Sequence, residues 1–243
     1  MKNRDFIITS LQPWDIEIGS TIKNTALEIS KNNRVLYINT PMDYSTRLRG
    51  NKNKAWTRRM DVIKKQASPI RQINEHMWIA DCPFCVLPVG GLPTTCLFDW
   101  INRINNRKIA DYIRQITAQL NFNNYIHLID TDIYRSQYLK EYLTPSLSIY
   151  YCRDFVIGES YWKKNGVRLE PLLAAKSDIV LANSTHFAER FRQYNRHTFS
   201  IETGVNLALY DGRKKWLIPE DIKPIPHPII GYVGTVNSTR LDS

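Results

Sequence analysis

The sequence predicts an α/β protein with a Rossmann-like, doubly wound parallel sheet. Residues 178–182 form a short, apolar, β-branched run, which is followed by helical spacing of Phe187, Phe191 and Tyr194 and by a second apolar run at 198–202. Residues 5–39 repeat the order, with a strand at 5–9, a helix at 20–32 and a strand at 34–39. Because short runs buried on both faces are typical of parallel strands, this alternation predicts a parallel sheet with helices on both faces.

The middle of the chain continues the same alternation. The further expected strands are residues 77–80, 125–130 and 148–152, and the further expected helices are residues 99–120 and 138–143. Apolar positions along the long helix predict its buried side, namely Ile101, Ile104, Ile109, Tyr112, Ile113 and Ile116. Asn183 or Ser184 is expected to cap the helix that follows residues 178–182.

Composition restricts the class of protein. A chain of 243 residues with 43% hydrophobic content can bury the core of one or two domains. No apolar run approaches the roughly 20 residues of a membrane span, and the first residues do not resemble a signal peptide. Four cysteines are too few for a disulfide framework, and the Cys82–Cys85 spacing has no second pair that would complete a metal site. We therefore expect structural thiols and a cytoplasmic location.

The formal charge of +10 calls for a negatively charged partner. Much of the excess lies in residues 47–65, where basic residues surround Trp56. One interpretation is contact with an anionic membrane surface, made by Trp56, Arg58, Arg59, Lys64 and Lys65. The other is a solvated loop and helix. No helix-turn-helix, RNP or zinc-finger pattern accompanies the charge, so nucleic acid is not expected as a partner.

Polar residues at strand ends indicate where a ligand binds. Arg153 and Asp154 directly follow the strand 148–152, and Asp130 ends the preceding strand. Open α/β sheets bind ligands beyond the carboxyl ends of their strands, so we predict that Asp154 and Arg153 carry the chemistry and that Asp130 contacts substrate. The alternative is that Arg153 and Asp154 form an ordinary surface ion pair. Trp14, in the loop after the first strand, is either a substrate contact or a packed loop aromatic.

Four segments together resemble one enzyme family. They are Tyr150-Tyr151-Cys152-Arg153-Asp154, Ser177-Asp178-Ile179-Val180-Leu181-Ala182-Asn183-Ser184, Glu202-Thr203-Gly204-Val205-Asn206 and Pro228-Ile229-Ile230-Gly231-Tyr232-Val233-Gly234. Their order and spacing are similar to those of glycosyltransferases of the GT-B fold, and most similar to the large retaining family that builds bacterial surface polysaccharides from nucleotide sugars.

The resemblance implies a set of substrates and further site residues. It implies a nucleotide-sugar donor, a glycan or lipid-linked acceptor, no cofactor and no metal. It adds Gly19, Gly204, Asn206 and Gly234 to the substrate-binding residues, with Gly234 matching a glycine that approaches the diphosphate. Arg153 and Asp154 match a strand-end position where the family commonly carries a His, so this chain departs from the pattern there.

The resemblance also implies how the chain divides into domains. Residues 1–210 correspond to an acceptor-side domain, 211–228 to a linker, and 229–243 to the first strand of a donor domain. We therefore expect the sequence to lack the donor domain that activity requires, and lipid-linked acceptors to place the enzyme at the inner face of a membrane. The alternative is a non-catalytic α/β module whose basic face binds an anionic partner or membrane.

Overall fold

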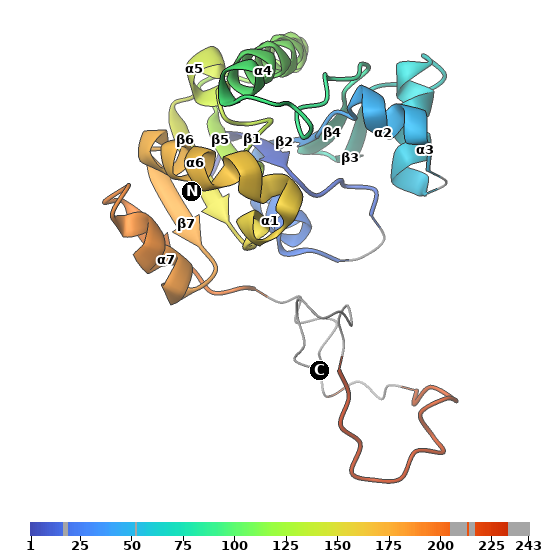
Figure 1. Ribbon diagram of the computed structural model, residues 1–243. Helices are drawn as coiled ribbons and strands as arrows, with labels where there is room; N and C mark the ends of the chain where they lie inside the picture. Colours follow the sequence, from blue (N-terminus) through green and yellow to red (C-terminus); the bar gives the residue numbers. More distant parts are fainter. Residues whose placement is uncertain (17–18, 52, 205–212, 214–216, 233–243) are drawn as a thin grey trace. The chain divides into compact units, whose positions relative to one another are not determined.

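The structure, a computed structural model, describes residues 1–16, 19–51, 53–204, 213 and 217–232. The chain divides into two units, Met1–Val205 and Asn206–Ser243. All helices and strands among the described residues belong to the first unit, which Figure 1 shows with most of its elements labelled. The described part of the second unit contains turns but neither helix nor strand.

The first unit is built on one sheet of eight strands in the order β3-β4-β2-β1-β5-β6-β7-β8. All neighbours are parallel except β3 and β4, which are antiparallel. The strands are β1 (Asp5–Ser10), β2 (Arg34–Asn39), β3 (Ile70–Asn74), β4 (Met77–Asp81), β5 (Ile126–Asp130), β6 (Leu147–Cys152), β7 (Ile179–Ala182) and β8 (Thr198–Ser200). The predicted α/β class and doubly wound parallel sheet are confirmed.

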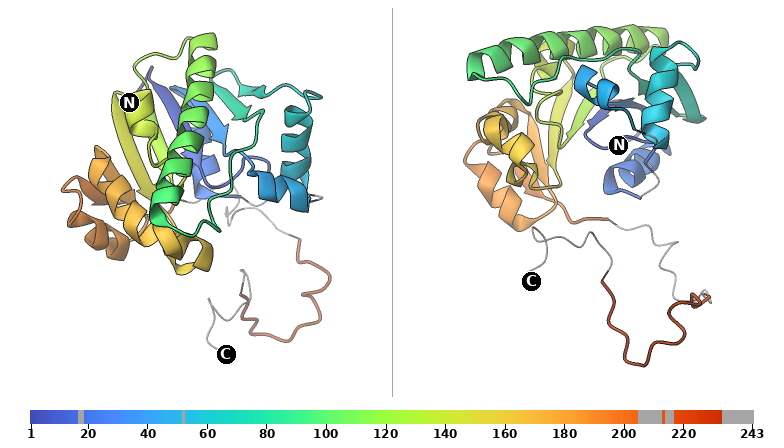
Figure 2. Two further views of the ribbon diagram at one scale, coloured as in Figure 1. Left: turned by 45° about the horizontal axis from the view of Figure 1, so that its top comes forward. Right: turned by 45° about the vertical axis from the view of Figure 1, so that its right-hand side comes forward.

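Helices cover the sheet from both sides. They are α1 (Thr21–Ser30), α2 (Tyr44–Arg49), α3 (Lys54–Ile63), α4 (Thr95–Gln119), α5 (Leu139–Leu143), α6 (Ser160–Lys176) and α7 (Thr185–Arg192), with a 3₁₀ turn, η1, at Val156–Gly158. The long helix α4 and α5 pack on Ile7, Leu36 and Ile38 of the sheet, whereas α1 packs on the opposite face (Figure 2). Because the strand order reverses at β1, the crossovers on its two sides lie on opposite faces.

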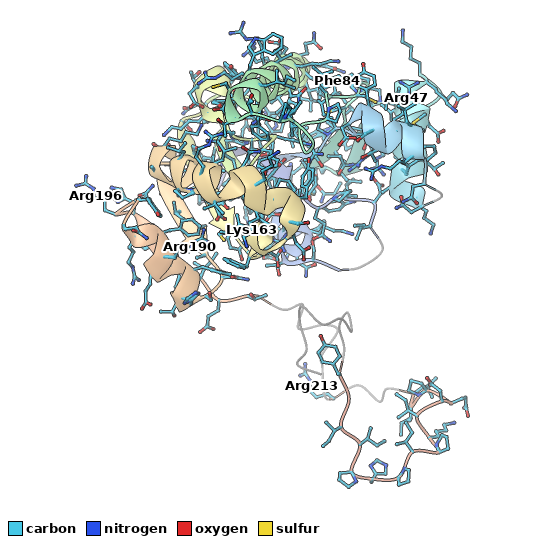
Figure 3. The ribbon with its side chains drawn as sticks, viewed as in Figure 1. Arg47, Phe84, Lys163, Arg190, Arg196 and Arg213 are labelled. Atoms are coloured by element: carbon cyan, nitrogen blue, oxygen red, sulfur yellow. The ribbon has the colours of Figure 1, made fainter. Side chains whose placement is uncertain are left out.

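Beyond β5, helices α6 and α7 cover the face that carries Ile129, Tyr150 and Val180. A partly buried ion pair joins these two helices, since Arg190 of α7, labelled in Figure 3, donates to Glu170 of α6 at 2.8 Å. The hydroxyl of Tyr150 donates to the same carboxylate at 2.8 Å. This network therefore anchors α6 and α7 to the middle of β6.

Helix starts follow local capping chemistry. The side chains of Ser20, Thr94 and Ser184 each accept a hydrogen bond from a backbone N–H in the first turn of the following helix. Ser184, rather than Asn183, is therefore the cap of α7. Helix α4 begins at Thr95, four residues before the predicted start at Asp99. Thr94 caps this earlier start, because its side chain accepts a hydrogen bond from a first-turn N–H that has no acceptor within the helix.

Two features of the helices differ from the sequence-based expectation. Ile104 was expected in the core but is 41% exposed, because buried positions of α4 are taken by hydrogen-bonded Asn102, Asn105 and Asn106. Helix α6 was not predicted, since Gly166 and Pro171 interrupt its helical pattern. The strand expected within residues 229–243 stays a prediction, because residues 233–243 lie outside the described residues.

Candidate functional site

A row of polar residues crosses the carboxyl edge of the sheet. Strands β4, β2, β1 and β5 end in Asp81, Asn39, Ser10 and Asp130, and the register pairs each of these residues with the next. All four are buried. Hydrogen bonds connect them in two pairs, from Asn39 Nδ2 to Asp81 Oδ1 at 2.6 Å and from Ser10 Oγ to Asp130 Oδ2 at 2.6 Å. The edge where an open α/β sheet binds ligands therefore carries a fixed polar floor.

Arg153 lies on this floor and is held by Asp130. Its Nη2 donates to Asp130 Oδ2 at 2.9 Å, and its Nε donates to Asp130 Oδ1. Burial alone would lower the pKa of Arg153, but the hydrogen bonds and negative charge of Asp130 outweigh burial and raise that pKa. Arg153 is therefore a fixed positive charge at the end of β6.

Asp130 itself has a supporting position. Its side chain is fully buried, and both of its oxygens already accept hydrogen bonds from Ser10 or Arg153. In the structure its carboxylate orients Arg153, and the contact of Asp130 with substrate stays a prediction.

Asp154 differs from Asp130 in its exposure. Its side chain is 63% exposed, and its Oδ2 lies 4.0 Å from Arg153 Nη1. Asn183, at the end of β7, donates from Nδ2 to the carbonyl of Arg153 at 2.6 Å, which fixes the backbone next to Asp154. Phe155, 56% exposed, stacks on Phe187 of α7 with ring centroids 6.2 Å apart. The end of β6 thus presents one exposed carboxylate beside a fixed guanidinium and an exposed aromatic ring.

The loop that carries Trp14 is tied to the other half of the floor. The backbone N–H of Trp14 donates to Asn39 Oδ1 at 2.8 Å, and its ring packs edge-on against Tyr37 with centroids 5.3 Å apart. The ammonium of Lys23 lies 5.5 Å from the same ring. Trp14 is therefore a packed, partly exposed loop aromatic at the carboxyl end of β1 and β2.

Arginines form ion pairs with acids near the carboxyl end of β4. Arg58 donates from Nε to Asp81 Oδ2 at 3.0 Å, and Arg71 donates to Asp15 at 2.8 Å. Arg59, next in α3, has its Nε and Nη2 buried, and the indole nitrogen of Trp56 is buried as well. Three of the five residues predicted to contact a membrane therefore turn toward the protein. Lys64 and Lys65 remain exposed after the end of α3.

The glycines of the predicted site are placed only in part. Gly19 and Gly204 are exposed, and no atom lies within 4 Å of the position that a Cβ would occupy on either. Asn206 and Gly234 lie outside the described residues. The structure therefore brings together Arg153, Asp154 and Asp130, with Trp14 on the neighbouring strand ends.

Sequence reasoning missed much of the polar floor. Ser10, Asn39 and Asp81 are not among the site residues predicted from the sequence, although each is the polar last residue of a mainly apolar strand, as Asp130 is. The recurrence of that feature on four strands was the available signal. The arginines of the 47–65 segment gave no comparable signal, because their partners are distant in sequence.

Comparisons with solved structures give weak similarities. The chain is similar to a sucrose-phosphate synthase from Thermosynechococcus elongatus, with 11% identity, a TM-score of 0.47, and coverage of 86% of this chain and 96% of that chain. It is also similar to a ugt transferase from Siraitia grosvenorii in complex with UDP, with 9% identity, a TM-score of 0.39, and coverage of 77% of this chain and 46% of that chain. Both TM-scores are too low to support a conclusion about function.

Sequence comparisons add no family. No protein-family model matches the chain, and no curated protein matches it either. Among the described residues, no helix is both long enough and apolar enough to cross a membrane. Because the sequence comparisons give no family, the α/β class is assigned from the observed sheet.

Proposed function

We propose that this chain is the acceptor-side part of a GT-B glycosyltransferase, which transfers a sugar from a nucleotide-sugar donor to a glycan or lipid-linked acceptor of cell-surface polysaccharide. The observation that carries the proposal is the exposed Asp154 beside Arg153, which Asp130 holds at the carboxyl end of β6. The four sequence segments that resemble the family support it, since two of them form β6 and β7 at this same edge.

The chemistry of sugar transfer fits such a pair. The nucleotide diphosphate leaves as an anion, so a transferase must stabilise negative charge and hold the acceptor hydroxyl against the anomeric carbon. Arg153 offers a guanidinium that needs little reorganisation, because Asp130 already fixes two of its nitrogens. Asp154 offers an accessible carboxylate that can accept a hydrogen bond from the acceptor or from the transferred sugar.

The remaining residues of the proposal have lesser roles. Trp14 and Gly19 belong to the loop after β1. Gly204, Asn206 and Gly234 belong to the segments that, by the resemblance, bind substrate. Attachment to the inner face of a membrane is also part of the proposal, and it would use Lys64 and Lys65, which are exposed.

The test is release of nucleotide diphosphate by the natural full-length protein. A panel of uridine and guanosine diphosphate sugars is offered with and without a membrane extract that supplies lipid-linked acceptors. We expect at least one donor to be turned over faster with the extract. If no donor is consumed under any condition while the protein still binds anionic vesicles, the non-catalytic binding module replaces this proposal.

A further inference from the structure

A cavity opens between helices α4, α5 and α6, which lie side by side in Figure 1. Its volume is about 450 Å³, within the range of roughly 300–1,000 Å³ that small-molecule pockets occupy. Lys176, one of its lining residues, ends α6 shortly before the amino end of β7, whereas Asp154 follows the carboxyl end of β6. The cavity is therefore separate from the strand ends proposed for sugar transfer.

Two ion pairs join the helices around this cavity. Arg168 Nη2 of α6 lies 2.7 Å from Asp99 Oδ1 of α4, and Lys176 Nζ of α6 lies 2.9 Å from Glu141 Oε1 of α5. The side chain of Lys176 is only 22% exposed, so its charge is partly shielded from solvent. Because these contacts exist in the free protein, a ligand would enter a cavity whose walls are already in place.

Tyr138 brings two cations together in the cavity. The guanidinium of Arg103 lies 4.4 Å from the centroid of the Tyr138 ring, and the ammonium of Lys176 lies 5.0 Å from the same centroid. Both distances are within the range of cation–π attraction. Arg168 and Lys176 have acids as partners, whereas Arg103 forms no ion pair with any residue that the structure describes. Arg103 therefore has a positive charge that no carboxylate of the described chain neutralises.

The lining combines this charge with apolar surface. Three of the lining residues are basic, namely Arg103, Arg168 and Lys176, and Asp99 is the one acid among those described. Leu172 also lines the cavity and is 50% exposed. It lies four residues from both Arg168 and Lys176 on α6, so the three side chains share one face of the helix. Such a lining suits a ligand that has both an anionic group and an apolar or sugar-like body.

A phosphoryl group is the anion that these cations match. A guanidinium presents a planar fork of donors to phosphoryl oxygens, and an ammonium binds them as a compact positive charge. We propose that the cavity between α4, α5 and α6 binds a phosphate monoester, with its phosphoryl group at Arg103 and Lys176 and its organic part against Leu172. The binding does not depend on the proposed transferase function, because none of these residues belongs to the strand ends that carry Asp154.

Calorimetric titration identifies the ligand class. The probes are inorganic phosphate, glucose 6-phosphate and uridine 5′-monophosphate, with glucose and uridine as their uncharged counterparts, each offered up to about 10 mM. We expect at least one of the two esters to bind, and to bind more tightly than inorganic phosphate and than its uncharged counterpart. The ester that binds more tightly distinguishes a sugar phosphate from a nucleotide as the source of the phosphoryl group.

The first variant removes the unneutralised charge. Arg103→Gln should weaken binding of the ester about 10-fold or more, because a hydrogen bond to a charged group contributes about 1.5–3 kcal/mol, and 1.4 kcal/mol is tenfold in Kd. Arg107→Gln is the matched control. Arg107 is likewise exposed on α4 and likewise lies over a tyrosine, 5.4 Å from the Tyr142 ring centroid, but it does not line the cavity. Since salt screens exposed charges, this control should change the Kd by no more than about twofold.

A second variant places a negative charge inside the cavity. Leu172→Asp should also weaken binding about 10-fold or more, because it repels the phosphoryl group and removes apolar surface from the ligand. Val167→Asp is its control, since Val167 is 54% exposed on the same helix but does not line the cavity. All four substituted residues are exposed, so the variants should fold as the wild-type protein does.

Three results would overturn the site. They are binding of neither ester, binding that survives Arg103→Gln or Leu172→Asp, and equal weakening by a variant and its control, which would show general attraction to the basic surface. Transferase activity is a separate outcome. A protein that releases no nucleotide diphosphate but binds an ester through Arg103 rejects the proposed function and keeps this site. An active transferase whose ester binding survives Arg103→Gln does the reverse.

Discussion

The guanidinium of Arg153 lies against the carboxylate of Asp130, with Nη2 2.9 Å from Oδ2 and Nε in contact with Oδ1. The two residues stand at the ends of the adjacent strands β5 and β6, and Asp130 has no exposed surface on its side chain. One carboxylate is thus used to position the cation, while the next acid along the chain, Asp154, stays exposed. Asp130 therefore has a supporting role, whereas Asp154 is accessible to a ligand.

Breaking this pair should destabilise the protein. Asp130→Asn removes the charge that compensates the buried Arg153, and loss of one partner of a buried ion pair costs about 3–5 kcal/mol. Urea unfolding measures the change. Asp154→Asn is the control and should stay within about 0.5 kcal/mol of the wild-type protein, since it is a surface substitution. Equal stability of Asp130→Asn and the wild type would show that the pair is not maintained in solution.

The stability of the protein should depend on Asp132 in a defined direction. Burial outweighs the attraction of Arg135 and raises the pKa of Asp132 from its ordinary value of 3.8 to about 6. A raised pKa means that the folded protein holds this proton more strongly than the unfolded chain. The resulting stability is fully present below about pH 4 and is lost as the pH rises through about 6.

Asp132→Asn is neutral at every pH, so it isolates this effect. Its free energy of unfolding relative to the wild type should rise between about pH 4 and pH 7, by at most about 3 kcal/mol. Burial lowers the pKa of His127 to about 3, so the contribution of His127 to the stability of the protein increases with rising pH. Because His127 is present in both proteins, this contribution cancels in the difference. A difference that does not change with pH would contradict the burial of Asp132.

The basic residues of α3 and of the turn after it should separate into two groups. Arg58→Gln removes the ion pair at 3.0 Å and leaves Asp81, among the described residues, with a longer one to Arg71 Nη2 at 3.8 Å, so we expect a loss of stability of about 1–3 kcal/mol. Neutralising Lys64 and Lys65 to glutamine should leave stability unchanged. It should weaken cosedimentation with anionic vesicles several-fold, because each basic residue near such a surface contributes about 1 kcal/mol. Unchanged cosedimentation, with neutral vesicles as reference, would remove membrane attachment from the proposal.

The strands could be predicted from sequence because their signal is local. Residues 34–39 form β2 as expected, and the other strands predicted within residues 5–202 differ from the observed ones only at their ends, whereas β3 was not predicted. Helix α6 could not be predicted in the same way, because packing decides it. A Cβ on Gly166 would lie 2.9 Å from Ile157 Cγ2, so the glycine that weakens the helical pattern is what allows close contact with η1.

The candidate site was predictable in position but not in its connections. The strand-end rule located Arg153 and Asp154 at the carboxyl edge, where the structure places them. Which acid pairs with Arg153 depends on strand register, and the adjacent Asp154 was as good a candidate in sequence as Asp130, 23 residues away. The inward turn of Arg58 and Arg59 was hidden for the same reason, since Asp81 is distant in the chain.

The most direct test of the proposed site is turnover by Asp154→Asn in the natural full-length protein. The substitution keeps the size and most hydrogen bonding of the side chain while it deletes the charge. We expect kcat for nucleotide diphosphate release to fall by about 10²-fold or more with an unchanged Tm, because a positioned polar group acts on the transition state rather than on folding. Near-normal turnover by Asp154→Asn, measured beside a wild-type protein that is active, would contradict the assignment of the site to the end of β6.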